Sequence, residues 1–452
     1  MKYPRYPKYR PSTTSFVREV PDHWEFRRLK TIASVFLSNV DKKSIEGQAT
    51  VRLCNYMDVY KHERITADLP FMAATATREQ VQRFALHRGD VLVTKDSESW
   101  TDIAVPAVVA EEMPSVLCGY HLALIRPLAL KSSGSYLARA FSAAGLREQF
   151  YVAANGITRF GLGGDALRTA QFPAPPLEEQ SSVARFLDAK TAEIDALIAK
   201  KEWLVELLEE KRAALITHAV TKGLDPDVPM QNTGTVGLIP AHWKPSRLSY
   251  LTDETRPIMY GIVLPGPHVP GGVPIVKGGD VTPRRLKLEL LSRTTVEIES
   301  GYVRSRLMGG DLVFAIRGSI GSVQPVPNEL LGSNLTQDAA RVSIRRGVNA
   351  DWLLFALRSQ LCQSQVQARA TGATIRGLNI RDLKRIVLPV PPRPEQDAIA
   401  LHLTTTTGHL DELAERVRLA IERLREYRTA LISAAVTGKI DVRGFQPSPP
   451  CQ

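Results

Sequence analysis

Apolar residues recur every seventh position in the last part of the chain, between residues 393 and 440. Charged side chains such as Glu412 and Arg416 fill the positions between them. This heptad spacing is typical of a long helix that packs along another helix. The predicted seam consists of Leu403, Leu410, Val417, Leu424 and Leu431, with Ile399, Leu413, Ala420 and Tyr427 on an adjoining seam.

A second stretch, residues 177–222, carries a similar pattern. At 1.5 Å per residue, a helix of about 40 residues is roughly 60 Å long and can act as a spacer. Two imperfect seams in one chain favour pairing of the two helices with each other over pairing between copies. The apolar positions of this stretch are Val183, Leu187, Ile194, Leu197, Leu204, Leu208 and Leu215.

The two stretches are copies of one another. Laying residue 172 over residue 388 aligns 54 positions without a gap, of which about 20 are identical, and "FPAPPLEEQ" falls over "LPVPPRPEQ". Further upstream "VPDHWEFRRL" at residue 20 matches "IPAHWKPSRL" at residue 239. The chain is therefore two homologous halves, each a variable stretch followed by a preserved helical stretch.

Each variable stretch reads as α+β. Short β-rich runs at residues 89–95, 122–127 and 310–323 are separated by Gly, Asn and Pro, and helical patterns occur near residues 135–150 and 351–370. The prolines of the repeated phrase end a strand, and the acidic residues after them favour the start of a helix. The predicted segments are a basic N-terminal tail (1–19), a first variable domain (20–176), a first helix (177–222), a linker (223–238), a second variable domain (239–392), a second helix (393–440) and a C-terminal tail (441–452).

Charge points to an acidic partner. The 452 residues carry a formal net charge of +11, and the excess lies mainly in the variable domains and the N-terminal tail, which we expect to be solvated. The four cysteines lack the spacing of a zinc site or a disulfide framework, and no signal peptide or membrane span is recognisable. A cytoplasmic protein without a membrane partner is expected.

No constellation typical of catalysis stands out. There is no phosphate-binding loop, "FGLGG" at residues 160–164 lacks dinucleotide-binding spacing, and no N/D-PP-Y/F tetrapeptide of adenine methyltransferases occurs. His23 and His242, each beside a tryptophan, are interpreted as anchors of a domain edge, and Asp90 and Asp311 as turn residues. Two alternatives stay open: a self-sufficient DNA methyltransferase or nuclease with diverged motifs, and an architectural DNA-binding coiled-coil protein.

The duplicated "IPxHW" entry, the "GLN" turn before "LPVPPRPEQ" and the helix end "ALISAAVTGKID" resemble the specificity subunit of type I restriction-modification systems. The resemblance covers nearly the whole chain. It implies two homologous α+β target recognition domains separated by two long helices that pair as an antiparallel coiled coil with pseudo-twofold symmetry. "TTTTGHL" at residues 404–410 departs from the pattern, because it is poor in helix formers.

The resemblance also implies a function and a set of partners. Each recognition domain would read one half of a split site in double-stranded DNA, and two modification subunits would methylate adenine, with restriction subunits completing the endonuclease. S-adenosylmethionine, ATP and Mg would be held by those partners, and this chain would hold no cofactor and no metal and would have no catalytic residue.

Candidate DNA-binding residues are polar or basic side chains in loops beside predicted strands, where they can reach base edges or phosphates. Arg159 and Arg376, on matching turns of the two halves, are better suited to phosphates. The other candidates are Lys95, Ser97 and Tyr120 in the first half and Arg317, Ser319, Asn334 and Gln337 in the second.

Overall fold

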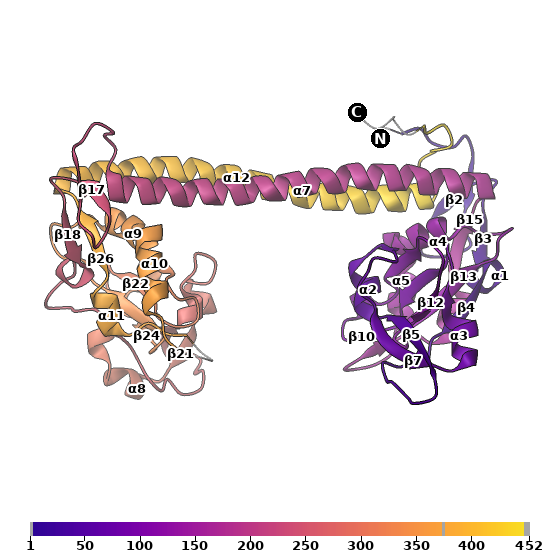
Figure 1. Ribbon diagram of the computed structural model, residues 1–452, viewed down its shortest axis with the longest axis horizontal. Coiled ribbons are helices and arrows are strands. Elements are labelled where there is room, and N and C mark those ends of the chain that lie inside the picture. The colour runs from indigo at the N-terminus through magenta and orange to yellow at the C-terminus, as the bar shows by residue number, and fades with distance from the viewer. Residues whose placement is uncertain (1–2, 373–375, 447–452) are drawn as a thin grey trace. The chain divides into compact units, whose positions relative to one another are not determined.

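The computed structural model describes residues 3–372 and 376–446. These residues form two compact units, one built from residues up to Lys201 together with those from Leu419 onward, and the other from Glu202–Arg418. Two long helices, α7 (Leu177–Lys222) and α12 (Arg393–Val436), each contribute one half to either unit (Figure 1). The α+β class and the contact between two long helices were both predicted from the sequence, and both are confirmed.

The first unit contains an α+β domain with two sheets. Its buried core is continuous with apolar residues of both long helices, such as Leu187 and Leu431. The five-stranded sheet has the order β4 (Ala33–Leu37), β13 (Leu122–Pro127), β9 (Val91–Thr94), β11 (Pro106–Val109) and β6 (Arg64–Ile65). The four-stranded sheet has the order β7 (Met72–Ala76), β5 (Ala49–Cys54), β12 (Met113–Cys118) and β8 (Ala85–Leu86).

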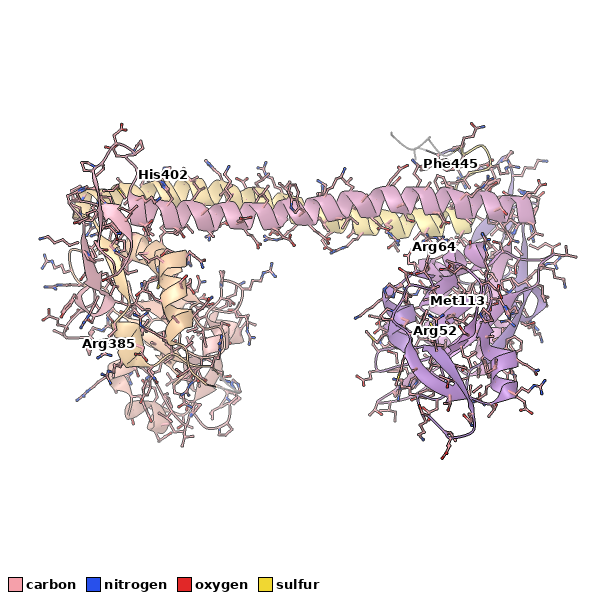
Figure 2. The ribbon with its side chains drawn as sticks, in the orientation of Figure 1. Arg52, Arg64, Met113, Arg385, His402 and Phe445 are labelled. Atoms are coloured by element: carbon pink, nitrogen blue, oxygen red, sulfur yellow. The ribbon has the colours of Figure 1, made fainter. Side chains whose placement is uncertain are left out.

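Short helices and two-stranded ribbons complete this unit. Figure 2 shows Arg64 on the side of the domain nearest the helices, whereas Arg52 lies farther from them. The helices are α1 (Leu29–Ile32), α2 (Tyr56–Lys61), α3 (Arg78–Phe84), α4 (Gly134–Ser142), α5 (Ala144–Ala153) and α6 (Gly164–Thr169). The ribbons are β1 (Tyr9–Pro11) with β2 (Glu19–Pro21), β3 (Glu25–Arg28) with β15 (Gln171–Ala174), and β10 (Asp96–Ser97) with β14 (Phe160–Gly161).

The second unit has a smaller set of sheets. Four strands have the order β19 (Met259–Tyr260), β25 (Ala339–Val342), β22 (Leu312–Ala315) and β23 (Val323–Pro325). Three have the order β21 (Ser292–Thr294), β20 (Val273–Val276) and β24 (Asn334–Leu335), and the ribbons are β16 (Met230–Asn232) with β17 (Leu238–Pro240) and β18 (Lys244–Arg247) with β26 (Val387–Val390). The helices are α8 (Val296–Ser300), α9 (Ala350–Arg358), α10 (Gln360–Arg369) and α11 (Ile380–Lys384).

The long helices run antiparallel within each unit. In the first, the N-terminal half of α7 packs on the C-terminal half of α12, and Arg428 Nε lies 2.8 Å from Asp195 Oδ1. In the second unit, the C-terminal half of α7 packs on the N-terminal half of α12, and Arg212 Nε lies 2.9 Å from Asp411 Oδ1. Each residue of the second pair stands 216 positions from its counterpart in the first, so the sequence repeat is also a repeat of contacts.

The main predicted seam of α12 is largely correct, but of the four residues predicted for the adjoining seam only Ile399 is buried. Leu413 and Tyr427 are 45% and 47% exposed, whereas Ala414 and Ile421 are buried. The second seam therefore follows each main-seam position by four residues, as knobs-into-holes packing requires. The helix also continues through residues 404–410, where Thr407 is buried, so the threonine-rich stretch does not interrupt it.

The repeated glutamate of "EEQ" and "PEQ" explains the histidine of each "HW" pair. His23 Nε2 lies 2.9 Å from Glu179 Oε2, in the first turn of α7. His242 Nε2 likewise lies 2.7 Å from Glu395 Oε1, in the first turn of α12. The interpretation of the histidines as anchors of a domain edge is therefore confirmed.

The tryptophan of each pair meets the end of the other helix. Trp243 is buried beside Gly223 after α7, and Trp24 is buried beside Gly438 after α12. Both glycines have positive φ, 80° and 70°, which suits glycine at a helix C-terminus. One "HW" pair thus joins the start of one long helix to the end of the other.

The N-terminal segment packs against the first unit. The sequence had favoured a solvated tail, and that expectation is wrong. Tyr6 is 3% exposed and its hydroxyl donates to Glu179, and burial raises the pKa of Tyr6 far above its usual value. Tyr3 packs edge-on against Phe186 of α7, and the amide of Asp441 donates to Pro4 O. Aromatic residues scattered among basic ones therefore cover the helix ends.

Candidate nucleic-acid interface

Lys95 and Ser97 follow β9 in the first unit. The register of β10 with β14 pairs Asp96 with Gly161 and Ser97 with Phe160, which brings Arg159 close to them. Lys95 Nζ donates to Asp96 Oδ2 at 2.8 Å, and its side chain is 15% exposed. Ser97 is buried, so both side chains are held in place by neighbours.

His121 links the remaining candidates of this unit. Arg159 Nη2 lies 3.2 Å from its ring nitrogens, Asp96 Oδ2 lies 3.2 Å from its Nδ1, and the ring of Tyr120 lies 3.6 Å from it, centroid to centroid. Burial lowers the pKa of His121, and nearby Arg159 and Lys95 lower it further against the opposing effect of Asp96. A neutral imidazole therefore lies among two cations and one carboxylate, a cluster suited to hydrogen bonding with bases and phosphates.

Three members of this cluster were not singled out from the sequence. Asp96 and His121 are immediate neighbours of the predicted residues, and this adjacency is the signal that could have found them. Tyr56 of α2 comes from farther away. Its hydroxyl lies 3.3 Å from Ser97 Oγ, and its ring stacks on Tyr60, which is 42% exposed.

Arg317 and Gln337 of the second unit line one cavity of about 330 Å³. Arg317 follows β22, forms a β-bridge with Gly377, and places its Nη1 3.7 Å from Asp338 Oδ1. That bridge holds the exposed Arg376 next to the cavity, while residues 373–375 lie outside the described part of the chain. Ser319 is half-buried in the turn after Arg317.

Asn334 has a different environment from the other candidates. It is fully buried in β24, where its Oδ1 accepts from Ser305 Oγ at 2.7 Å and its Nδ2 donates to Glu299 Oε1 at 3.0 Å. Glu299 in turn accepts from Arg306, whose hydrogen bonds outweigh burial and lower the pKa of Glu299. This arrangement gives Asn334 a structural role in bracing the domain.

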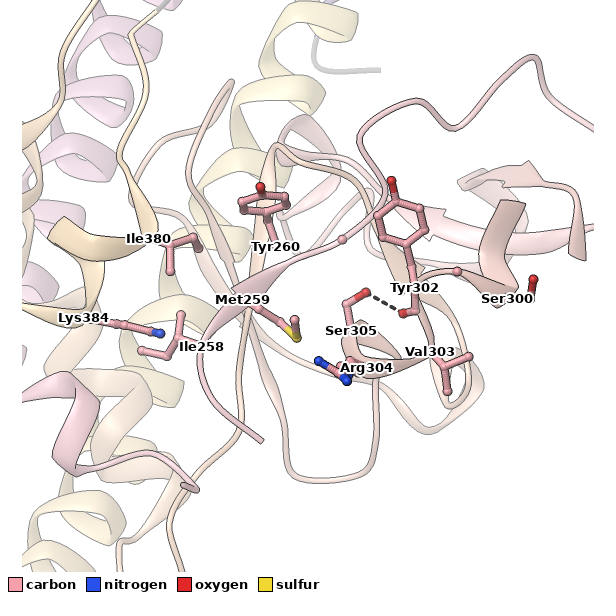
Figure 3. Close-up of a pocket in the computed structure, with 12 residues that line it drawn as sticks. Ile258, Met259, Tyr260, Ser300, Tyr302, Val303, Arg304, Ser305, Ile380 and Lys384 are labelled. Atoms are coloured by element: carbon pink, nitrogen blue, oxygen red, sulfur yellow. Dashed lines mark hydrogen bonds between the residues drawn. The ribbon is translucent and has the colours of Figure 1, made fainter. Parts of the chain in front are cut away.

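A larger cavity of about 690 Å³ adjoins the cavity lined by Arg317 and Gln337, and the two share Tyr260 and Ile380 (Figure 3). Tyr260 and Tyr302 line this larger cavity, and Arg304 and Lys384 add positive charge. Aromatic rings and cations in one hollow suit nucleotides, because rings stack on bases while cations meet phosphates. No periodic pattern in the sequence marks these residues, since they come from three separate segments, 258–261, 300–305 and 380–384.

The described residues contain no group of three or more His, Cys, Asp or Glu side chains that could hold a metal ion. None of the described helices combines the length and apolar character needed to cross a bilayer. Three cysteines, Cys54, Cys118 and Cys362, are buried and free. Burial raises the pKa of each of these thiols, to about 12 for Cys362, so they are packing residues.

Comparison with known proteins identifies the family. Residues 268–423 match the family model for the type I restriction modification DNA specificity domain. The EcoBI specificity subunit of Escherichia coli is 26% identical over 65% of this chain and 64% of its own length. The EcoKI specificity subunit of E. coli K12 is 20% identical over 95% of this chain and 92% of its own length.

The chain belongs to the type I restriction-modification specificity subunits. A specificity subunit provides DNA specificity within a type I complex; it is not the catalytic subunit, and the family carries no cofactor of its own. Solved structures show the same fold. A chain of a type I R-M system matches with a TM-score of 0.70 and 16% identity, covering 93% of this chain and 99% of its own length. An HsdS subunit from Thermoanaerobacter tengcongensis matches with a TM-score of 0.51 and 17% identity, covering 93% of this chain and 98% of its own length.

Proposed function

We propose that this specificity subunit reads a bipartite site in double-stranded DNA, one half-site per recognition domain, and positions two modification subunits for adenine methylation. The observation that carries the proposal is the presence of a separate polar and basic cluster in each unit, around Asp96 in the first and around Arg317 in the second. The two clusters differ in residues and in geometry. We therefore expect the two half-sites to differ in sequence.

The candidate DNA-binding residues divide by exposure. Arg159, Arg317 and Arg376 are exposed and suited to phosphates or to guanine edges. Lys95 and Ser97 are held by neighbours, so a base contact by either would be pre-organised. The proposed DNA-binding set is Lys95, Ser97, Tyr120, Arg159, Arg317, Ser319, Gln337 and Arg376. For Asn334, which is buried, the proposed role is to brace the domain.

The proposed boundaries follow the internal repeat. Each recognition domain ends at the repeated proline pair, and each spacer helix begins directly after it. The proposed segments are 20–176 and 239–392 for recognition, 177–222 and 393–440 for spacing, 223–238 for the linker, and 1–19 and 441–452 for the terminal segments.

Docking of other subunits on the helices is supported by exposed apolar side chains. In the second unit Trp203 is 62% exposed, and Leu207 and Leu413 are 43% and 45% exposed. Exposed apolar groups of this size are typical of protein interfaces. S-adenosylmethionine would be held by the modification subunits, ATP and Mg by restriction subunits that complete the endonuclease, and the assembly would work in the cytoplasm.

Exchange of one domain tests the two-reader model. Residues 239–392 would be moved into another specificity subunit, and methylated adenines would be mapped by long-read sequencing. We expect one half-site of the recognised sequence to change and the other to persist. A pattern identical to that of the recipient, in a chimera that still methylates, would contradict the proposal.

A further inference from the structure

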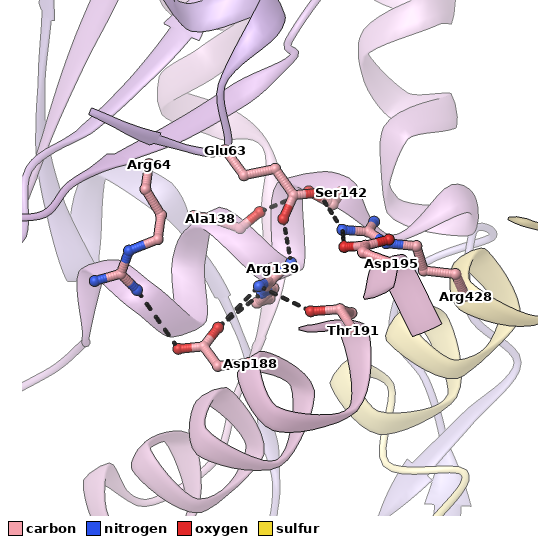
Figure 4. Close-up of polar contacts among 9 residues, drawn as sticks. All are labelled: Glu63, Arg64, Ala138, Arg139, Ser142, Asp188, Thr191, Asp195 and Arg428. Carbon is pink, nitrogen blue, oxygen red and sulfur yellow. Dashed lines mark hydrogen bonds and ion pairs between the residues drawn. The ribbon is translucent and has the colours of Figure 1, made fainter. Parts of the chain in front are cut away.

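The recognition domain of the first unit is latched to both long helices by carboxylates (Figure 4). Glu63 accepts from Arg139 Nη1 at 2.8 Å and from Arg428 Nη2 at 2.6 Å. Asp188 of α7 accepts from Arg139 Nη2 at 2.8 Å, and Asp195 accepts from Arg428 Nε at 2.8 Å. Two arginines thus share three carboxylates, and the hollow beside them measures only about 20 Å³.

The corresponding junction of the second unit lacks this latch. Arg212 and Asp411 repeat the pair formed by Arg428 and Asp195, but a cavity of about 510 Å³ lies beside them. Strand β23 and helix α9 border this cavity through Gln324 and Arg358, as β11 and α4 border the small hollow in the first unit. No second carboxylate reaches Arg212 from the described part of the recognition domain.

The side of the cavity that the recognition domain forms contributes no carboxylate, since Pro283, Arg284, Gln324 and Arg358 line it there. Arg358 uses only neutral acceptors, donating to Val323 O at 3.1 Å and to Gln324 Oε1 at 2.9 Å. Burial lowers the pKa of Arg358, and nearby Arg212 lowers it further against the opposing effect of Asp411. Two arginines therefore share one carboxylate, Asp411, where the first unit supplies three.

The atoms of Arg212 show the same deficit. Its Nε is buried and lies 2.9 Å from Asp411 Oδ1, so the two form an ion pair, but the contact does not have the geometry of a hydrogen bond. Arg284, which also lines the cavity, is exposed and has no carboxylate partner among the described residues. Arg212 therefore has one poorly aligned carboxylate and Arg284 has none, which favours an added anion at this cavity.

We propose that this cavity, bordered by Arg212, Arg284 and Arg358, binds an acidic side chain of another protein subunit of the complex. The carboxylate would take the place that Glu63 occupies in the first unit. This inference rests on the proposed function, because it requires that the chain assembles with other subunits.

A protein carboxylate fits better than a DNA strand. Glu209 and Glu415 also line the cavity, where each lies within 4 Å of Arg418, at 2.6 and 3.6 Å. A continuous row of phosphates would meet these acids as well as the arginines. One inserted carboxylate meets the arginines alone, as Glu63 does.

The test introduces a carboxylate into the cavity by substitution of a residue of this chain. In the full-length chain, Gln324→Glu places an acid beside Arg358, and Gln324→Met is the neutral control of similar size. The probe is the purified methyltransferase subunit encoded with this chain, titrated by calorimetry at two salt concentrations without DNA. We expect Gln324→Glu to weaken binding at least tenfold and to raise the melting temperature of the chain alone, with binding by Gln324→Met close to wild type.

A second pair of variants does not depend on a buried position. Arg284→Gln removes an exposed arginine at this junction, and Arg64→Gln removes one at the junction of the first unit. We expect the first to weaken subunit binding several-fold and the second to leave it unchanged.

The outcomes separate the two proposals. A wild-type chain that fails to bind the methyltransferase subunit would overturn the proposed function itself. Wild-type binding that is matched by both Gln324→Glu and Arg284→Gln would overturn the carboxylate site alone. Unchanged subunit binding with weakened DNA binding by Arg284→Gln would assign the cavity to phosphate and also overturn it.

Discussion

Glu63 is the residue on which the first junction depends most. Burial raises the pKa of its carboxyl group, but Arg139 and Arg428 outweigh burial and hold the pKa below its ordinary value of 4.5. A carboxylate with a depressed folded-state pKa stabilises the fold above its unfolded pKa, and this contribution is lost as pH falls through the folded value. The latch should therefore weaken only under acidic conditions.

Substitution of Glu63 by glutamine tests this. At neutral pH the variant should be less stable by about 1 kcal/mol or less, because the side chain is half-exposed and solvent screens the pairs. The difference in unfolding free energy from wild type should shrink as pH falls from 6 toward 3, and urea titrations at each pH measure it. A difference that stays constant over this range would show that the charge of Glu63 is not what stabilises the junction.

The sequence indicated the candidate DNA-binding residues better than it indicated the residues with which they interact. Lys95 and Ser97 were recognisable because they follow a β-rich run, and they do lie in a polar cluster. Their partner Arg159 is brought to them by a two-residue strand pairing, which leaves no pattern in the chain. Asn334 looked like a base reader because it is a polar residue near a strand, and only the packed fold shows that its amide is buried.

The ends of the long helices repeat, but not equally tightly. A Cβ on Gly438 would lie 2.3 Å from Pro21 Cδ, whereas a Cβ on Gly223 would lie 3.4 Å from the nearest atom of Trp243. Both residues have positive φ, so both favour glycine. A residue with a Cβ would strain the backbone at both positions, but it would clash with a neighbouring side chain only at position 438.

Alanine at each position should separate these effects. Gly223→Ala should lower the unfolding free energy by about 1 kcal/mol from the left-handed backbone alone. Gly438→Ala should cost clearly more, because Pro21 and Trp24 must also shift. Equal losses in urea unfolding of the two variants would show that Pro21 gives way without cost.

The helices were the most predictable elements. The internal repeat and the heptad pattern together predicted both helices, because the buried face of a long amphipathic helix appears in the sequence as a periodic pattern of apolar residues. The adjoining seam of α12 was misplaced because Thr407 and Arg428 occupy it, and a polar residue does not mark a seam. Arg428 is tolerated there because Asp195 and Glu63 neutralise it.

At the scale of the whole molecule, helix length is the proposed determinant of the gap between half-sites. Removing one heptad from each helix shortens each by about 10 Å, at 1.5 Å per residue. At 3.4 Å per base pair this should shorten the unread gap by about three base pairs. Methylation mapping measures the gap, and replacing a heptad by another of equal length is the control. An unaltered gap in an active shortened subunit would exclude the helices as the ruler.

The packing of Tyr6 and Val442 into the core of the first unit has a consequence for synthesis. The core of that unit combines Tyr6 and Trp24 with Leu431, Ala435 and Val442 from the far end of the chain. The second unit needs no residue beyond Arg418. A ribosome therefore completes the second unit first, and the recognition domain translated earliest must wait for the last residues before its core can close.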